Sequence, residues 1–372
     1  MSCWLAACAL AVALAARNAP AQDGPEPGIA AHVAAWLRAR AEPDQGAGAA
    51  ALGAIEAGLA AAPLSAVDVW SRILDLSRVQ DAPWPVGVVH TARSMGLSYW
   101  VRLPEPYEPR AHPVPMILIL AEPGPQPPAE MVEGLPEAVR DQAVLVALDL
   151  APLPIGAWRD QWAAIGTPLA ELFASLRVDR DRVAVVGSGV GADLAVLLAA
   201  LHPEWFHALG LVGGAAAPEE PGARALPVRA LHPDLPQAAL WCLQQPPRDP
   251  DPRAFDLTLA DPRMGRAFWV HVVEFDYAGV SSPGTTAQLQ VAADRASNTV
   301  RIDGVGVDQV DLYLNDRLVD LDRPIHIVRN GFNYDFHAAR SLRIVLELFY
   351  RHRDPGSVYP VIVRGLYLPR RD

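Results

Sequence analysis

The chain has 372 residues, 51% of them hydrophobic and 20% charged, a composition typical of a globular protein and not of a disordered one. This length is enough for at least two domains, each with its own core. The net charge is −11, every fixed positive charge is an arginine, and no run of arginines forms a basic stripe, which argues against nucleic-acid binding.

The first 21 residues are typical of a secretory signal peptide. An apolar stretch over residues 4–16 is followed by Arg17 and by the small-residue cleavage pattern Ala19-Pro20-Ala21. The stretch is shorter than the ~20 residues that a membrane-spanning helix needs. We therefore expect cleavage after Ala21, export to the periplasm or the extracellular space, and no stable membrane span in the mature protein.

Cysteines are too few to form a disulfide framework. Cleavage after the predicted signal removes Cys3 and Cys8 and leaves Cys242 alone. A single cysteine forms no internal disulfide, so packing has to stabilise the fold. Cys242 lies between Trp241 and Leu243, and we interpret it as a small buried hydrophobic residue and not as a reactive thiol.

Residues 22–82 are predicted to form a small helical region. Apolar residues such as Ile29, Val33 and Leu37 recur at helical spacing, and Ser65 with Asp68 is similar to the capping box that begins a helix.

Residues 83–262 are predicted to form an α/β domain. A helix is expected near residues 162–176, and buried strands are predicted at 115–120, 143–150, 182–186, 208–212 and 227–231. Apolar strands separated by helix-length segments indicate a mostly parallel sheet with helices on both faces.

Residues 263–372 are predicted to form a compact, sandwich-like β-rich domain. Their short, alternating apolar and polar segments are typical of half-buried antiparallel strands. Asn330-Gly331 predicts a tight hairpin turn, because both residues tolerate positive φ. One helix is expected where Leu342, Val345 and Phe349 share a face.

The segment Gly187-Ser188-Gly189-Val190-Gly191 follows a predicted strand and precedes an amphipathic helix. Its glycine spacing is that of G-x-S-x-G, the nucleophile elbow, in which flanking glycines allow neighbouring backbone to pass closely. Gly189 stands where the motif needs serine. Ser188 precedes that position, and in an elbow the preceding side chain does not point into the site.

Residues 95–235 resemble the secreted esterase and peptidase group of α/β-hydrolases, which includes polyhydroxybutyrate depolymerase-like and prolyl-oligopeptidase-like enzymes. SYWVRLPEPYEP is similar to their entry strand, VDRDRVAVVG to the approach to the elbow, and LHPEWFHALGLVGG to the exit. The segment VDLYLNDRLVDLDRPIHIVRNG resembles a β-rich module appended to some secreted bacterial hydrolases of this group. The resemblance implies an α/β-hydrolase-like fold with a β-rich C-terminal domain.

Three parts of the catalytic machinery that this resemblance implies are missing from the sequence. Gly189 has no side chain to form an acyl-enzyme. The expected oxyanion loop, 121–125, contains two prolines without N–H groups and Glu122, whose negative charge opposes anion binding. Asp234 stands at or near the position of the acid, but the next histidine, His271, lies in a predicted strand of the C-terminal domain.

We expect no cofactor and no metal site. The glycine turn lacks the lysine of a phosphate loop and the later features of a dinucleotide fingerprint. The acidic groups lack both EF-hand spacing and a neighbouring histidine pair. We interpret these groups as solvated turns. A calcium site in a loop is the alternative for the third of them. The groups are Asp249/Asp251, Asp303/Asp308 and Asp316/Asp320/Asp322.

Three functional hypotheses follow. The first is an exported protein that has lost serine-hydrolase catalysis and binds or scaffolds a small-molecule, peptide or polymer ligand. The second is an active serine esterase or peptidase with a rearranged site, for which the candidate residues are Ser188, Asp234 and His232. The third is binding of carbohydrate or another surface polymer through the C-terminal domain.

Overall fold

The computed structural model describes residues 84–94, 96–105, 107–108, 112–122, 124, 127–152, 158–213, 228–259, 265–275, 286–352 and 354–369, together with residues 50, 53 and 54. The predicted signal peptide and nearly all of the predicted helical region 22–82 lie outside the described residues. Two compact units contain the described parts of the chain. The first comprises Met1–Met116, Pro123–Asp179 and Leu346–Pro355, and the second comprises Ile117–Glu122, Arg180–Val345 and Gly356–Asp372.

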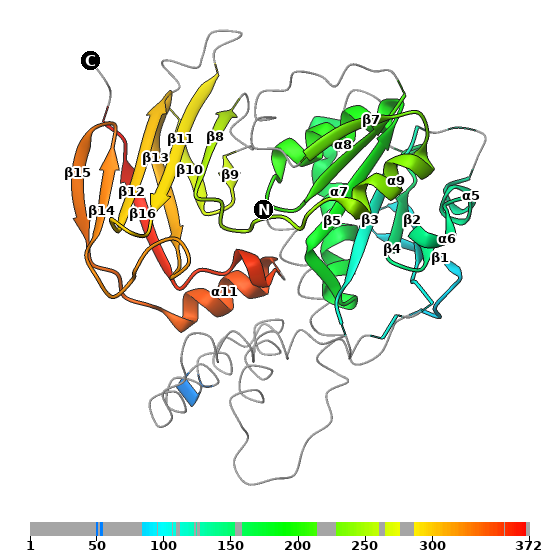
Figure 1. Cartoon of the computed structure of the whole chain (residues 1–372), viewed down its shortest axis with the longest axis horizontal. Coiled ribbons are helices and arrows are strands. Elements are labelled where there is room, and N and C mark those ends of the chain that lie inside the picture. The colour runs from blue at the N-terminus through cyan, green and yellow to red at the C-terminus, as the bar shows by residue number, and fades with distance from the viewer. Residues whose placement is uncertain are drawn as a thin grey trace. The chain divides into compact units, whose positions relative to one another are not determined.

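Seven strands form one sheet in the order β1-β2-β4-β3-β5-β6-β7 (Figure 1). β5, β6 and β7 are parallel, whereas β2 pairs antiparallel with both β1 and β4. The apolar runs predicted as buried strands are confirmed, and β4 is buried along its whole length. The fold is therefore α/β-hydrolase-like. The strand bounds are β1 Val89–Ser94, β2 Leu97–Arg102, β3 Val114–Leu120, β4 Val144–Leu148, β5 Val178–Ser188, β6 Ala208–Val212 and β7 Val228–His232.

The helices of the first unit are α5 (Pro128–Glu133), α6 (Glu137–Arg140) and α7 (Trp158–Ser175). α7 confirms the helix predicted near 162–176 and begins four residues earlier. Within this unit the buried Arg102 guanidinium donates to the Arg140 carbonyl at 2.6 Å.

The second unit contains α8 (Val190–Leu201) and α9 (Leu235–Gln244). α9 packs on β6, because a Cβ added at Gly210 would lie 3.2 Å from both Ala238 Cβ and Cys242 Sγ. Cys242 is fully buried, and burial raises the pKa of its thiol to about 12. The prediction that Cys242 is a packing residue is therefore confirmed.

The remainder of the second unit contains two further sheets, in the orders β16-β13-β10-β9 and β15-β14-β12-β11-β8. The predicted hairpin turn is confirmed, with φ of 47° at Asn330 and 89° at Gly331. The predicted helix is α11, Leu342–His352. The strand bounds are β8 Ala254–Leu259, β9 Arg266–Ala267, β10 Val270–Phe275, β11 Ala287–Asp294, β12 Thr299–Val305, β13 Val307–Leu314, β14 Ile325–Arg329, β15 Phe332–Phe336 and β16 Val361–Tyr367.

The expected boundary at residue 263 differs from the observed strand pairing. β8 precedes that boundary, yet it pairs antiparallel with β11 along its whole length. β8 is therefore an edge strand of the C-terminal sheet, and the β-rich part begins at Ala254. The proline-rich run that precedes β8 hid this change, because prolines interrupt the periodic pattern by which strands are recognised.

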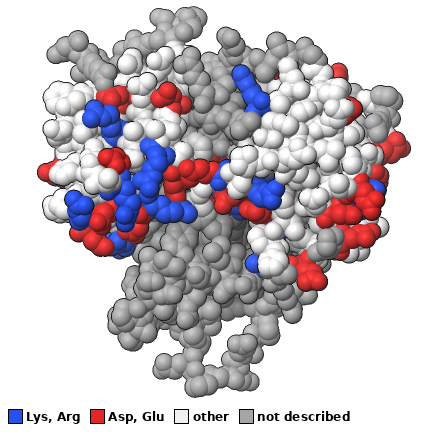
Figure 2. Space-filling model, viewed as in Figure 1, with Lys and Arg blue, Asp and Glu red and all other residues white. Residues whose placement is uncertain are grey.

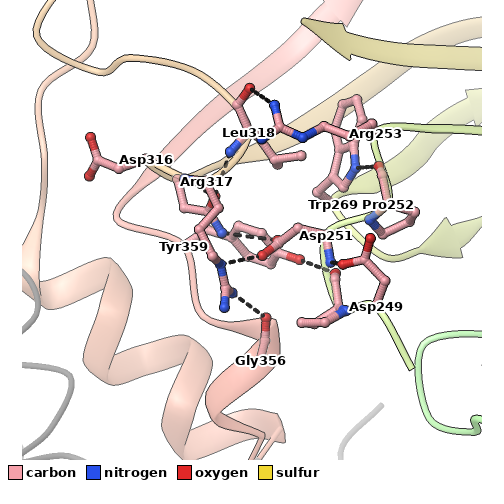
Figure 3. Close-up of polar contacts among 12 residues, drawn as sticks. Asp249, Asp251, Pro252, Arg253, Trp269, Asp316, Arg317, Leu318, Gly356 and Tyr359 are labelled. Atoms are coloured by element: carbon pink, nitrogen blue, oxygen red, sulfur yellow. Dashed lines mark hydrogen bonds and ion pairs between the residues drawn. The ribbon is translucent and has the colours of Figure 1, made fainter. Parts of the chain in front are cut away.

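A polar network around the buried Asp251 ties the segment before β8 to the rest of the β-rich part (Figure 3). Asp251, only 6% exposed, forms an ion pair with Arg317 and accepts a hydrogen bond of 2.9 Å from Asn315. Trp269 donates its indole N–H to the Pro252 carbonyl at 2.8 Å. Asp251 therefore has a structural role, which its position in an acidic turn did not indicate.

The densest acidic group of the sequence is held by an arginine. The Arg340 guanidinium bonds both Asp316 and Asp322. Asn298, fully buried, binds the backbone of the same turn by accepting from Asp320 N at 2.7 Å and donating to Pro324 O at 2.9 Å. On the face drawn in Figure 2, acidic and basic side chains of the β-rich part are interleaved.

Candidate functional site

A tight turn joins β5 to α8 at the position of the predicted elbow. β5 ends at Ser188, α8 begins at Val190, and Gly189 alone forms the turn between them, with φ 54° and ψ −130°. Positive φ is a strained conformation for a residue with a side chain and costs a glycine little. The turn is therefore similar in form to the strand-to-helix turn of a nucleophile elbow, with a glycine at its apex.

Both flanking glycines are required by close packing. A Cβ added at Gly187 would lie 2.6 Å from the Ala192 Cα, inside van der Waals contact. One added at Gly191 would overlap the Leu120 carbonyl oxygen at the end of β3. The predicted reason for these glycines, close passage of neighbouring backbone, is confirmed.

Glu122 occupies the space above the apex. A Cβ added at Gly189 would overlap Glu122 Oε2 and lie 2.9 Å from the Glu122 Cβ and 3.0 Å from its carboxyl carbon. The Glu122 carboxylate thus lies where the side chain of a nucleophile would begin. Glu122 is exposed and comes from the loop after β3, the loop that supplies an oxyanion donor in active hydrolases.

The backbone of this loop is also engaged. Glu122 N donates to the Ser188 carbonyl at 3.1 Å, so this N–H is directed at the elbow and not at a ligand. A carboxylate beside the apex further disfavours a developing negative charge, because like charges repel. The arrangement therefore opposes oxyanion stabilisation in both its hydrogen bonding and its charge.

Ser188 lies on the α9 face of the sheet. In the register of the parallel strands, Ser188 is beside Val212 and Val212 is beside His232. Val212 follows Gly210 by two residues and shares its face, which α9 covers. Ser188 and His232 are two strands apart, about 10 Å between Cα atoms. Among the described residues, no hydrogen bond joins the Ser188 hydroxyl to a histidine.

His232 is packed against an aromatic side chain. Its ring centroid lies 5.1 Å from that of Trp241 in α9. Burial lowers the pKa of His232, and the Asp234 carboxylate partly opposes this shift. Its Nε2 is shielded from solvent without a hydrogen-bond partner in the described part of the chain. No described acid or nucleophile therefore orients this imidazole.

Asp234 is the N-cap of α9. Its Oδ1 accepts from the Gln237 backbone N–H at 2.8 Å, and its Oδ2 accepts from the Gln237 side-chain amide at 3.3 Å. This is the usual way in which an aspartate begins a helix. The residue named as the candidate triad acid thus has a complete structural role.

Two other histidines that precede Asp234, His202 and His207, are engaged elsewhere, and His271 lies in a strand of the β-rich part. His202 stacks on Trp205 with 3.9 Å between ring centroids, and His207 Nε2 lies 2.9 Å from the Cys242 carbonyl. His271 lies in β10, as predicted, and burial lowers its pKa.

The three candidate residues are not brought together: Ser188 lies at the elbow next to Gly189, His232 lies two strands away, and Asp234 begins α9. The sequence pointed to Glu122 only as an unfavourable charge in the oxyanion loop. Its position over Gly189 depends on the path of that loop, which no local pattern encodes.

The described residues contain neither a cluster of metal-ligating side chains nor a helix that could span a membrane. No group of three or more His, Cys, Asp or Glu side chains is arranged to hold a metal ion in that part of the chain. No helix there is long and apolar enough to cross a membrane.

No protein-family model and no curated protein matches the sequence. Solved structures match part of it. A thermostable esterase is 15% identical over 42% of this chain and 50% of that chain, with a TM-score of 0.30. An acetyl xylan esterase from Aspergillus awamori is 15% identical over 34% of this chain and 51% of that chain, with a TM-score of 0.29. Est1E from Butyrivibrio proteoclasticus is 14% identical over 34% of this chain and 51% of that chain, with a TM-score of 0.28. The chain spans about half the length of these structures.

Proposed function

We propose that this protein is a non-catalytic protein with an α/β-hydrolase-like fold, which binds a ligand near the elbow without hydrolysing it. One observation carries the proposal. The apex keeps the strained turn of a nucleophile elbow, but its residue is Gly189 and the space for a nucleophile is filled by Glu122. A covalent acyl intermediate has no atom at this position on which to form.

Charge narrows the class of ligand. Glu122 is exposed beside the apex, and Asp193 is exposed in the first turn of α8. These carboxylates repel an anionic group and favour a neutral or cationic one. The proposed ligand is thus a small molecule, peptide or polymer that presents an uncharged or positively charged group to the elbow.

Hydrolysis by a rearranged site is the less favoured alternative. It requires Ser188 to be activated by a histidine within ~3 Å. Ser188 faces α9, His232 packs on Trp241, and Asp234 caps α9. The three candidates therefore do not form a hydrogen-bonded chain.

Export is part of the proposal and rests on residues 1–21 alone. The apolar segment and the Ala19-Pro20-Ala21 pattern support a cleaved signal peptide. Mass spectrometry of the mature N-terminus tests this, and a chain that begins at Gln22 is expected.

Ester turnover tests the loss of catalysis. Short-chain nitrophenyl esters are supplied to the wild-type chain and to the Ser188→Ala and Asp234→Asn variants. All three are expected to hydrolyse the esters at the same low rate, because none holds an activated nucleophile. Saturable turnover in the wild type that Ser188→Ala abolishes would contradict the proposal and favour the rearranged site.

A further inference from the structure

β15 is an exposed edge strand. It ends the order of the five-stranded sheet and, among the described strands, pairs with β14 alone (Figure 1). Its first four residues are all exposed, including Phe332 at 55% and Tyr334 at 42%. Two large aromatic side chains thus lie on a strand with one unpaired side, a combination that promotes pairing with another strand.

Of the devices that usually protect an edge, β15 lacks a bulge and a proline and has a single charged residue. Its five residues pair with β14 in regular register, without a bulge and without proline. Its one charged residue, Asp335, is matched by His326 of β14, with 2.6 Å between Oδ1 and Nδ1. In the other sheet, edge strand β9 has two residues and edge strand β16 is irregular beside Gly365. Short or irregular edges resist pairing, and β15 is neither very short nor irregular.

The free backbone groups of β15 can be identified from the hairpin. A two-residue turn is closed by a hydrogen-bonded pair, here Arg329 and Phe332. Hydrogen-bonded and non-hydrogen-bonded pairs alternate along an antiparallel ladder. Phe332, Tyr334 and Phe336 therefore direct their backbone groups at β14, and Asn333 and Asp335 direct theirs outward.

The strand is self-complementary. Its sequence, Phe-Asn-Tyr-Asp-Phe, reads almost identically in both directions about Tyr334. In an antiparallel pairing of two copies centred on Tyr334, each Asn333 lies opposite Asp335 of the second copy. Asn333 and Asp335 are the residues whose backbone groups point outward. In this register each Asn333–Asp335 pair can therefore exchange both backbone hydrogen bonds between the two copies.

Side chains favour the same register. On one face, Phe332 lies opposite Phe336 of the second copy and the two Tyr334 rings meet, which joins the aromatic residues into one continuous strip. On the other face, the Asn333 amide can donate to the Asp335 carboxylate. A shift by two residues that centres the pairing on Asp335 sets two carboxylates against each other, which is unfavourable.

We propose that β15 is a homodimer interface, through which two copies of this chain join their five-stranded sheets into one continuous sheet. The interface is isologous, as a twofold dimer requires. A contact built mainly on two five-residue strands lies at or below the lower end of the ~1,200–2,000 Å² that stable interfaces bury. The dimer is therefore expected to dissociate on dilution.

Sedimentation velocity of the full chain over a wide range of concentrations tests the proposal. The wild type is expected to change from monomer to dimer as concentration rises. Asn333→Asp sets carboxylates opposite one another and is expected to weaken association about tenfold. The double variant Asn333→Asp/Asp335→Asn again places an amide opposite each carboxylate, and its association is expected to recover.

Gln288→Glu is the matched control, because residue 288 lies opposite the uncharged Val305 and Thr258. It adds the same charge to the exposed face of β11, three strands from β15 in the sheet order, and is expected to leave association unchanged. Thermal unfolding of each variant shows whether the fold is retained.

Two results would overturn the proposal. One is a wild type that stays monomeric at every concentration. If that monomer is retained on insoluble cellulose or chitin and Tyr334→Ala abolishes the retention, β15 binds a polymer ligand and not a second copy. The other is a dimer that the folded Asn333→Asp variant leaves intact, because its interface would lie elsewhere.

Discussion

The Glu122 carboxylate lies over Gly189, in the space that any side chain at position 189 would need. Substitution of Gly189 therefore has two costs, strain at positive φ and a clash with Glu122. Gly189→Ala is expected to lower the free energy of unfolding by about 1–3 kcal/mol. Chemical denaturation of the purified variant measures this loss.

The clash can be separated from the strain. In a Glu122→Gly background the same Gly189→Ala substitution is expected to cost less, with a coupling free energy of about 1 kcal/mol. Gly213→Ala is the control, because Gly213 also has positive φ, 83°, but no atom of the described residues lies within 4 Å of an added Cβ. Equal costs of Gly189→Ala in the two backgrounds would mean that Glu122 does not fill the site.

Asp234 is predicted to act as a helix cap and not as a catalytic acid. Asp234→Ala removes the acceptor for the Gln237 N–H and is expected to destabilise the protein by about 1 kcal/mol. Asp234→Asn keeps a capping oxygen and is expected to cost much less. Thermal or chemical unfolding distinguishes the two variants, and an equal loss of stability in both would contradict the capping role.

Cys242 is predicted to be inert in the folded protein. Burial raises its pKa to about 12, and only the thiolate attacks a disulfide reagent. With Cys3 and Cys8 replaced by serine, a chromogenic aromatic disulfide is expected to react with Cys242 only after denaturant is added. Rapid reaction of the native protein would show that α9 leaves the thiol accessible.

Asp251 is predicted to make stability depend on pH. Burial raises the pKa of this carboxyl above its ordinary value of 3.8, so the folded state holds the proton more tightly than the unfolded state does. The stabilisation that protonated Asp251 contributes is therefore fully present below the ordinary pKa of 3.8. It is lost as pH rises through the folded-state pKa.

Asp251→Asn removes this titration. The stability advantage of the wild type over Asp251→Asn is therefore expected to shrink as pH rises above 3.8 and through the folded-state pKa. Asp256→Asn, at an exposed position of β8, provides the comparison. An advantage of the wild type over Asp251→Asn that grows with pH would contradict the sign of the shift.

Local signals were sufficient for most of the fold. The runs that became β3, β4 and β5 are continuous and apolar because these strands lie in the middle of a sheet, and Asn330-Gly331 specifies its turn through positive φ. The elbow could also be located from a local signal, the spacing of Gly187 and Gly191, because close backbone contacts require glycine at both positions.

Contacts between distant parts of the sequence were not predictable in this way. Asp251 and Asn315 are 64 residues apart, and neither position carries a pattern that names its partner. β8 was assigned to the preceding domain because its pairing with β11 is not a local property. The position of Glu122 over Gly189 is of the same kind.

Labelling with a fluorophosphonate probe tests the central claim, that the elbow has no working nucleophile, most directly. The probe reacts covalently with an activated serine, and intact mass spectrometry reports one added probe per labelled chain. The native protein is expected to remain unlabelled, as is its Ser188→Ala variant. Stoichiometric labelling of the native protein at Ser188 that disappears in Ser188→Ala would contradict the claim.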